Sequence, residues 1–271
     1  MTVRILVGDV RQKLAELPDE SVHCCVTSPP YWRQRDYGVV GQIGMEREPA
    51  EYIDVLSGVF SEVRRTLSSS GTLWLNVADK WASGGNGGGG ILSVKRGAWR
   101  ALAGEKGWRT PPVGFKDKDL VLAAFLLAER LRQDGWFLRK TIIWSKPNAT
   151  EPCRLDRPSL SHEYLFLLSK RNDSAARDPG ENWWHSSVWE IAPGSHEDHP
   201  AVMPAELARR AIVAGSQPLD TILDPFGGAG TTGLVADRLG RDCTLIELNP
   251  EYAAMARLRI ERDAGLFAEL A

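Results

Sequence analysis

The chain has 271 residues, of which 43% are hydrophobic and 25% charged, with a formal net charge of −2 at pH 7. These values are ordinary for a soluble globular protein, and they exclude disorder, collagen and coiled coil as descriptions of the whole chain. The longest apolar run, residues 120–128, has about half the length of a membrane span, and residues 2–9 lack the apolar core of a signal peptide.

The hydrophobic pattern predicts strands that alternate with helices along the whole chain. Strands are predicted at residues 4–8, 22–27, 72–77, 137–144, 164–168, 221–223 and 243–246. Helices are predicted at residues 10–17, 50–67, 119–133, 204–214, 231–239 and 251–262. We expect a turn at 68–71 and an irregular, acidic segment at 171–198. The alternation predicts an α/β protein with a mostly parallel sheet, in a single domain over residues 1–271.

Residues 82–118 are predicted to form a Gly-rich, basic insertion in this domain. Between residues 81 and 118 seven basic residues stand against two acidic ones. A basic loop on an acidic body can supply local phosphate contacts. On charge alone, a solvated loop is the favoured alternative.

A glycine-rich loop follows the predicted strand at 221–223 and opens a helix. Its sequence is Asp224-Pro225-Phe226-Gly227-Gly228-Ala229-Gly230-Thr231-Thr232-Gly233. Glycines spaced in this way allow a tight turn and a close approach of backbone to a ligand. Glu247 ends the next strand, where a carboxylate usually binds ribose hydroxyls. The pair predicts a nucleoside-containing cofactor, against the alternative of a glycine turn that only packs a helix on a strand.

The charge of this loop indicates which nucleoside-containing cofactor it binds. Asp224 occupies the position of a pyrophosphate, which a carboxylate repels. Only 43 residues follow Gly228, too few for the second half of a dinucleotide site. S-adenosyl-L-methionine is cationic and has a ribose but no phosphate, so it is the predicted cofactor, and a nicotinamide dinucleotide is disfavoured.

A second loop, Ser28-Pro29-Pro30-Tyr31-Trp32, follows the apolar strand at 22–27. Each proline restricts the residue before it to an extended conformation, so this segment is stiff. The Ser28 hydroxyl and the Pro29 carbonyl can then point outward as acceptors beside aromatic faces. Such a surface suits a planar base with an exocyclic amine. A plain rigid loop or a polyproline ligand is the alternative.

These two motifs resemble those of the amino-group DNA methyltransferases, and their order is similar to that of the β class. The resemblance covers most of the chain and implies a Rossmann-like fold with a seven-stranded sheet, helices on both faces and a circularly permuted motif order. It assigns catalysis to Ser28, Pro29, Pro30 and Tyr31. It also places Asp9 at the adenine of the cofactor, and residues 199–204 at its methionine end. Cofactor binding is thus expected at Asp9, Asp224, Pro225, Phe226, Gly227, Gly228, Gly230, Thr231, Thr232 and Glu247.

The resemblance implies direct transfer of a methyl group to the amine of a base flipped out of double-stranded DNA. Hydrogen bonds to Ser28 and Pro29 would stabilise the partly positive nitrogen of the transition state. Tyr31 would stack on the base. Serine in the first motif position is commoner in cytosine-N4 enzymes, which makes cytosine N4 the expected target and adenine N6 the alternative.

DNA contact is expected away from the usual family position. The interval at 171–198 has two basic and six acidic residues, which suits DNA poorly. The insertion at 82–118 is the better candidate, through Arg96, Arg100 and Arg109. The side chains of Trp32, Arg33 and Arg35 are further candidates.

The remaining expectations concern setting and partners. Four cysteines without CxxC spacing indicate a reducing cytoplasm and no metal site. A homodimer is plausible at this chain length. An RNA or protein methyltransferase, or a non-catalytic nucleic-acid-binding relative, remains a more remote alternative.

Overall fold

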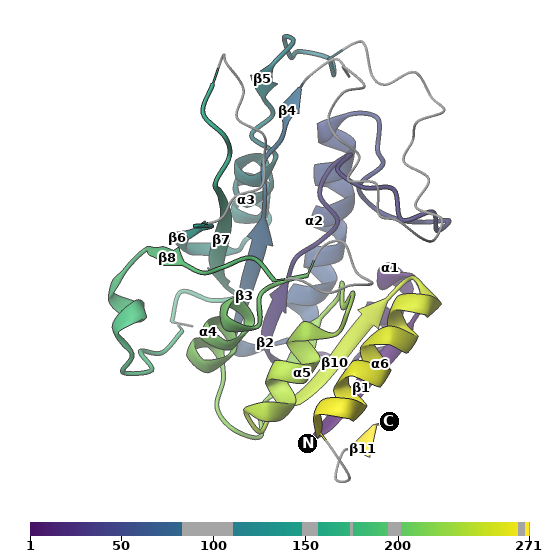
Figure 1. Ribbon diagram of the computed structural model, residues 1–271, viewed down its shortest axis with the longest axis vertical. Coiled ribbons are helices and arrows are strands. Elements are labelled where there is room, and N and C mark those ends of the chain that lie inside the picture. Colours follow the sequence, from purple (N-terminus) through teal and green to yellow (C-terminus); the bar gives the residue numbers. More distant parts are fainter. Residues whose placement is uncertain (83–110, 148–156, 174–175, 195–201, 265–268, 271) are drawn as a thin grey trace.

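A nine-stranded β-sheet forms the core of the part of the protein that the structure describes (Figure 1). The structure is a computed structural model that describes residues 1–82, 111–147, 157–173, 176–194, 202–264 and 269–270. The strands are β1 (Thr2–Val7), β2 (Val22–Thr27), β3 (Leu67–Val77), β6 (Phe137–Ser145), β7 (His162–Ser169), β8 (Val188–Glu190), β9 (Thr221–Asp224), β10 (Asp242–Glu247) and β11 (Glu269–Leu270). Their order across the sheet is β11-β1-β10-β9-β2-β3-β7-β6-β8.

The sheet is mostly parallel, as predicted. Strands β11, β1, β10, β9, β2 and β3 all run in one direction, whereas β7 is antiparallel to both of its neighbours. The seven predicted strands are all present. The two additional strands, β8 and β11, are short and lie at the two edges, so they extend the predicted sheet without changing its topology.

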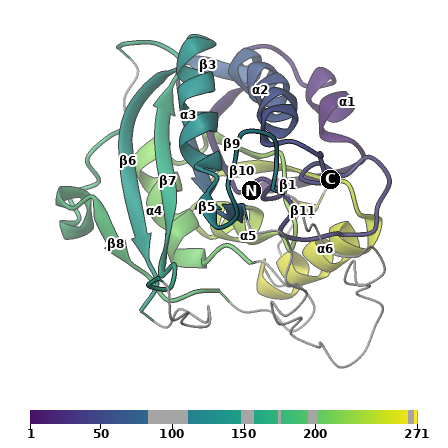
Figure 2. The same ribbon diagram turned by 90° about the horizontal axis from the view of Figure 1, so that it is seen from above.

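Helices cover both faces of the sheet (Figure 2). Side chains of α1 (Val10–Ala15), α2 (Pro49–Thr66) and α3 (Ala123–Gln133) belong to one buried cluster. Those of α4 (Ala205–Gly215), α5 (Thr231–Arg238) and α6 (Pro250–Ala264) belong to the second. A 3-10 helix, η1 (Asn182–His185), precedes β8. Two hydrophobic layers around one sheet confirm the predicted α/β class.

Helix α2 shows how the sequence determines these elements. Glu48 and Glu51 form a reciprocal capping box around Pro49, which begins the helix. This arrangement pairs backbone N–H groups that the first turn leaves without an intrahelical partner. One face is then buried through Tyr52, Ile53, Leu56, Val59, Phe60 and Val63. That face is the one that the apolar spacing predicted.

The turn predicted at residues 68–71 is wrong, because β3 runs through it. Val22 of β2 pairs with Leu67 and Cys24 with Thr72, so the residues between Leu67 and Thr72 bulge out of the pairing with β2. The serines and glycine therefore mark an irregularity within a strand rather than its start.

The helix predicted at 119–133 begins four residues later than expected. Asp119 and Leu120 form β5, which pairs with β4 (Trp81–Ala82) in a separate two-stranded sheet. Leu122 then has a φ of 60°, which no helical residue adopts, and Asp79 accepts a hydrogen bond from the N–H of Ala123 at 3.1 Å. Pairing with a segment distant in sequence thus decided the start of α3.

The segment at 171–198 is also more regular than predicted, because η1 and β8 lie within it. Trp189 of β8 is buried between the rings of Trp74 and Trp183. Aromatic packing of this kind explains why an acidic segment forms the edge of the sheet.

Candidate active site

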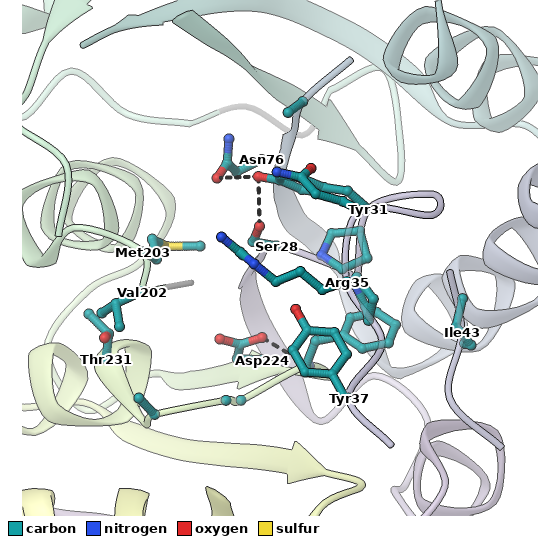
Figure 3. A pocket seen from close by; sticks show the side chains of 18 of the residues that line it. Ser28, Tyr31, Arg35, Tyr37, Ile43, Asn76, Val202, Met203, Asp224 and Thr231 are labelled. Atoms are coloured by element: carbon teal, nitrogen blue, oxygen red, sulfur yellow. Dashed lines mark hydrogen bonds between the residues drawn. The ribbon is translucent and has the colours of Figure 1, made fainter. Parts of the chain in front are cut away.

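A cavity of about 980 Å³ lies at the edge of the sheet where the parallel strands end. Both predicted loops line it (Figure 3). The residues that follow β1, β3 and β10 line it as well. Ligands of open α/β sheets bind at this edge because the carboxyl ends of parallel strands meet there. The described residues of the insertion at 82–118 include none that line the cavity.

The two loops are joined directly at the buried side chain of Asp224. The Thr27 hydroxyl donates to Asp224 Oδ1 at 2.6 Å across 197 positions of sequence, and the Thr232 hydroxyl donates to Oδ2 at 2.7 Å. The N–H of Phe226 also donates to Oδ1, at 3.0 Å. Burial raises the pKa of this carboxyl, which is 4% exposed. Asp224 therefore holds the end of β2 against the glycine loop, besides lending its charge to the cavity.

The glycines of the loop serve two different purposes. Gly228 has a φ of +49° and directs its N–H to Glu247 Oε2 at 2.8 Å. Gly230 does not line the cavity; it has a φ of +76°, and a Cβ there would lie 2.8 Å from Ala256 Cβ of α6. Gly228 thus forms the wall toward a ligand, whereas Gly230 allows α5 and α6 to pack closely.

Two carboxylates, those of Glu247 and Asp9, also line the cavity. Glu247 also accepts the N–H of Asn249 at 2.8 Å, and burial raises its pKa. Asp9 caps α1 by accepting the N–H of Arg11 at 2.9 Å, and the hydrogen bond from the Arg11 side chain lowers its pKa. A carboxylate has about four acceptor sites, so both groups retain capacity for hydroxyl or amino donors.

The other predicted cofactor residues lie close by. Pro225, Phe226, Gly227, Thr231 and Thr232 all line the cavity. Of the stretch at 199–204, Val202 and Met203 line it as well, and residues 199–201 lie outside the described part of the chain.

The second predicted loop, residues 28–32, is called the serine loop, and it follows β2 directly. Ser28, Pro29, Pro30 and Tyr31 all line the cavity. The hydroxyl of Tyr52 on α2 donates to the carbonyl oxygen of Pro30 at 3.0 Å, which anchors the loop on the helix. Ser28 Oγ donates to the Tyr31 hydroxyl at 3.0 Å (Figure 3).

A polar cluster that the sequence did not predict surrounds the Tyr31 hydroxyl. This hydroxyl lies 2.6 Å from Glu163 Oε2 and 3.2 Å from Asn76 Oδ1. Lys146 forms an ion pair with the other Glu163 oxygen. Burial, and secondarily the Glu163 charge, raise the pKa of Tyr31 well above its usual value. The signal available in the sequence was a glutamate and an asparagine inside otherwise apolar strands.

The residues predicted to contact DNA are placed differently from one another. Trp32 is only 5% exposed, belongs to the hydrophobic core and donates its indole N–H to the Glu46 carbonyl oxygen, so its side chain does not face the solvent from which DNA would approach. Arg33 Nε donates to the same oxygen at 2.7 Å, and burial lowers the pKa of Arg33 to about 10. Arg35 extends into the cavity beside Ser28 (Figure 3).

The remaining three DNA candidates, Arg96, Arg100 and Arg109, lie outside the described residues. In the part of the chain that is described, no group of three or more His, Cys, Asp or Glu side chains could hold a metal ion. No described helix is both long and apolar enough to cross a membrane.

Comparison with known proteins identifies the family. The sequence-family model N6_N4_Mtase, which describes DNA methylases, matches residues 22–258 of this chain. The chain belongs to this family. The Type II methyltransferase M.SmaI of Serratia marcescens is 45% identical over 279 residues, covering 96% of this chain and 91% of its own. M.Cfr9I of Citrobacter freundii is 40% identical over 265 residues, covering 94% and 87% of the two chains.

Solved structures agree with this assignment. TTHA0409 of Thermus thermophilus, solved in complex with S-adenosyl-L-methionine, superposes with a TM-score of 0.69 at 28% identity over 99% of both chains. The cytosine-N4-specific PvuII DNA methyltransferase has the same fold, with a TM-score of 0.72 at 22% identity over 96% of this chain and 86% of its own. The predicted enzyme class, an S-adenosyl-L-methionine-dependent DNA methyltransferase, is confirmed.

Proposed function

We propose that this methyltransferase modifies cytosine N4 in double-stranded DNA, with Ser28, Pro29 and Tyr31 at the target base. The observation that carries the proposal is the direct link between the serine loop and the cofactor loop through Thr27 and Asp224. It supports the proposal because residues of both loops line one cavity.

The residues of the cavity fit S-adenosyl-L-methionine. Asp9 and Glu247 offer carboxylates to hydroxyl and amino donors, and Gly228 lines the cavity beside Glu247 without a side chain. The loop at 224–232 contains no Lys or Arg that could pair with a diphosphate, and its Asp224 favours a cation. When bound, the cofactor supplies an electrophilic methyl group on a cationic sulfur.

The protein's own contribution is to orient and polarise the target amine. An aromatic exocyclic amine is a poor nucleophile because its lone pair is delocalised into the ring. Ser28 Oγ and the Pro29 carbonyl would accept its N–H groups and favour the pyramidal, partly positive nitrogen of the transition state. The Tyr31 ring would offset part of the cost of unstacking the base, which is on the order of a few kcal/mol.

Serine at position 28 supports cytosine N4 over adenine N6. Serine gives a neutral acceptor where aspartate, commoner in adenine-N6 enzymes of the family that this sequence resembles, gives a charged one. For DNA contact we keep the insertion at 82–118 as the proposal, with Arg96, Arg100 and Arg109. Replacing these three with Ala should weaken DNA binding and lower its salt dependence by about one unit of slope for each phosphate that the variant no longer binds.

The test is transfer of a labelled methyl group to duplex DNA, RNA and protein in parallel, followed by digestion and mass analysis of the nucleosides. We expect N4-methylcytosine from DNA alone, and for Ser28→Ala a loss on the order of 100-fold in rate with cofactor binding retained. Formation of N6-methyladenine alone would reject the target base. Labelling of RNA or protein without DNA would reject the substrate.

A further inference from the structure

A chain of hydrogen bonds leads from the cavity wall into the sheet. It starts at Ser28 Oγ, which donates to the Tyr31 hydroxyl at 3.0 Å, and ends at Glu163 Oε2, 2.6 Å from the same hydroxyl. Its three members come from the loop after β2 and from the second residue of β7, separated by 132 positions. Of these three, only Ser28 is proposed to contact the amine itself.

The direction of these hydrogen bonds is fixed by the groups around Glu163. Asn76 Nδ2 donates to Glu163 Oε2 at 3.0 Å and to the Tyr164 carbonyl oxygen at 3.2 Å, so its amide nitrogen faces away from Tyr31. The Tyr31 hydroxyl has one proton, and its contact with Glu163 is shorter than its 3.2 Å contact with Asn76 Oδ1. Because its pKa is raised, Tyr31 remains protonated and donates to Glu163. It therefore accepts from Ser28.

This direction determines what Ser28 offers to the cavity. Its proton is engaged by Tyr31, so the free lone pairs of Oγ are available to an amine N–H. A neutral hydroxyl is a weak acceptor, but a hydroxyl that donates into a chain ending at a carboxylate is polarised by it. The charge that an aspartate would supply at position 28 is thus present two hydrogen bonds behind the serine, on Glu163.

We propose that Glu163 is a positioning residue for methyl transfer, which acts through the Tyr31 hydroxyl to orient Ser28 Oγ as an acceptor and to take up the proton that the amine loses. The inference rests on the proposed function, since it requires a base amine at Ser28. Lys146, paired with the other Glu163 oxygen, holds the carboxylate in place.

The step balances in atoms and charge. The nitrogen–carbon bond forms as the carbon–sulfur bond breaks, and the electron pair of that bond remains on sulfur. The nitrogen then carries one proton too many and gives it to Ser28 Oγ. Ser28 passes its own proton to Tyr31, and Tyr31 passes its proton to Glu163. Neutral Glu163 returns this proton to solvent before the next turnover.

The kinetic test uses Tyr31→Phe, Glu163→Gln and the double variant under single-turnover conditions, with cofactor and DNA saturating. We expect each single variant to lose about tenfold or more in the transfer rate, while cofactor affinity measured by calorimetry changes less than about twofold. The double variant should be no slower than the slower single variant, whereas independent roles would multiply to about 100-fold. The wild-type rate should also show a solvent deuterium isotope effect that both variants lack.

Tyr52→Phe is the matched control, because it too removes a buried hydroxyl that contacts the serine loop, through Pro30. It lies outside the hydrogen-bond chain, so its effect should multiply with that of Glu163→Gln. A readout independent of turnover is the proton spectrum: a short hydrogen bond to a carboxylate gives a downfield, slowly exchanging resonance. This resonance should be present in the wild type and absent in Tyr31→Phe and in Glu163→Gln.

The outcomes are distinguishable. A wild type that methylates DNA, with Glu163→Gln transferring at the same rate, would overturn the inference alone. So would multiplying effects of Tyr31→Phe and Glu163→Gln. A wild type that transfers no methyl group to DNA would overturn the proposed function instead. Should Glu163→Gln fail to fold, Tyr31→Phe carries the test through rate, isotope effect and resonance, because it leaves Glu163 paired with Asn76 and Lys146.

Discussion

Replacing Asp224 tests whether its hydrogen bonds hold the end of β2 against the glycine-rich loop. Asp224→Ala leaves three donors without their acceptor, namely the hydroxyls of Thr27 and Thr232 and the N–H of Phe226. A buried donor without a partner costs about 1–3 kcal/mol. At the lower figure, the free energy of unfolding falls by about 3 kcal/mol, a large part of the about 5–15 kcal/mol typical of a domain.

Asp224→Asn separates the hydrogen bonds from the charge. The amide retains one acceptor oxygen for Thr27 and Phe226, and the Thr232 hydroxyl can accept from its nitrogen. Because burial raises the pKa of Asp224, the fold favours the neutral carboxyl relative to the charged one. Removing the charge should therefore cost about 1 kcal/mol or less, well below the effect of Asp224→Ala.

The pH dependence has a definite sign. Since the pKa of Asp224 is higher in the folded chain than its usual 3.8, the folded state holds more protons between the two values. The contribution of this group to stability is then largest below 3.8 and declines as the pH rises through the folded pKa. In Asp224→Asn this decline should be absent.

The assay is urea unfolding followed by tryptophan fluorescence, with the m-value checked for constancy. Asp242→Asn is the control, since Asp242 sits at the start of β10 and accepts one backbone hydrogen bond, from Thr2. Equal losses for Asp224→Ala and Asp224→Asn would refute the reasoning, because the charge and not the hydrogen bonds would then hold the loops together. A loss below about 1 kcal/mol for Asp224→Ala would refute it as well.

Three further predictions concern Lys80, Glu247 and Trp32. Burial lowers the pKa of Lys80 from 10.5 to about 8. Between pH 8 and pH 10.5 Lys80 is therefore protonated in the unfolded chain and neutral in the folded one, so its contribution to the free energy of unfolding rises with pH over this interval. Lys80→Met should accordingly be more stable than wild type at pH 7 by about 1–3 kcal/mol, with the gain shrinking toward pH 10.5 in unfolding curves; a gain that is constant with pH would contradict this. Glu247→Ala should weaken cofactor binding about 10- to 100-fold by calorimetry, and unchanged binding would remove Glu247 from the site. Trp32→Ala should lower stability by about 3–5 kcal/mol, and Trp32→Phe should keep DNA affinity, whereas a weakened affinity in the folded Phe variant would restore Trp32 as a DNA-binding residue.

Much of the architecture follows from local patterns in the sequence. Strand β2 coincides with the predicted residues 22–27, and α2 differs from its prediction by one residue at each end. That Ser28 and Asp224 line one cavity also followed from the sequence, since parallel strands of one sheet have their carboxyl ends on the same side. These features depend on the spacing of apolar residues and on the direction of the strands, both of which can be inferred from short stretches of the sequence.

The features that escaped prediction depend on partners distant in sequence. Glu163 acquires its place at Tyr31 only when β7 aligns beside β3, and the start of α3 is decided by the pairing of β5 with β4. Trp32 ends the serine loop, yet its indole is buried in the core and donates its N–H to the carbonyl oxygen of Glu46. A proposed homodimer likewise depends on surfaces that no local pattern reveals, and sedimentation would test it.

The parallel direction of β1 and β11 has a practical consequence. Thr2 pairs with Glu269, so both ends of the described chain lie beside each other at the amino edge of the sheet, opposite the cavity (Figure 1). A fusion partner, fluorescent label or surface linker attached at either end would project from the rear of the enzyme. The protein is therefore suited to tethering beside a chosen locus, because the attachment leaves the entrance for the nucleic acid open.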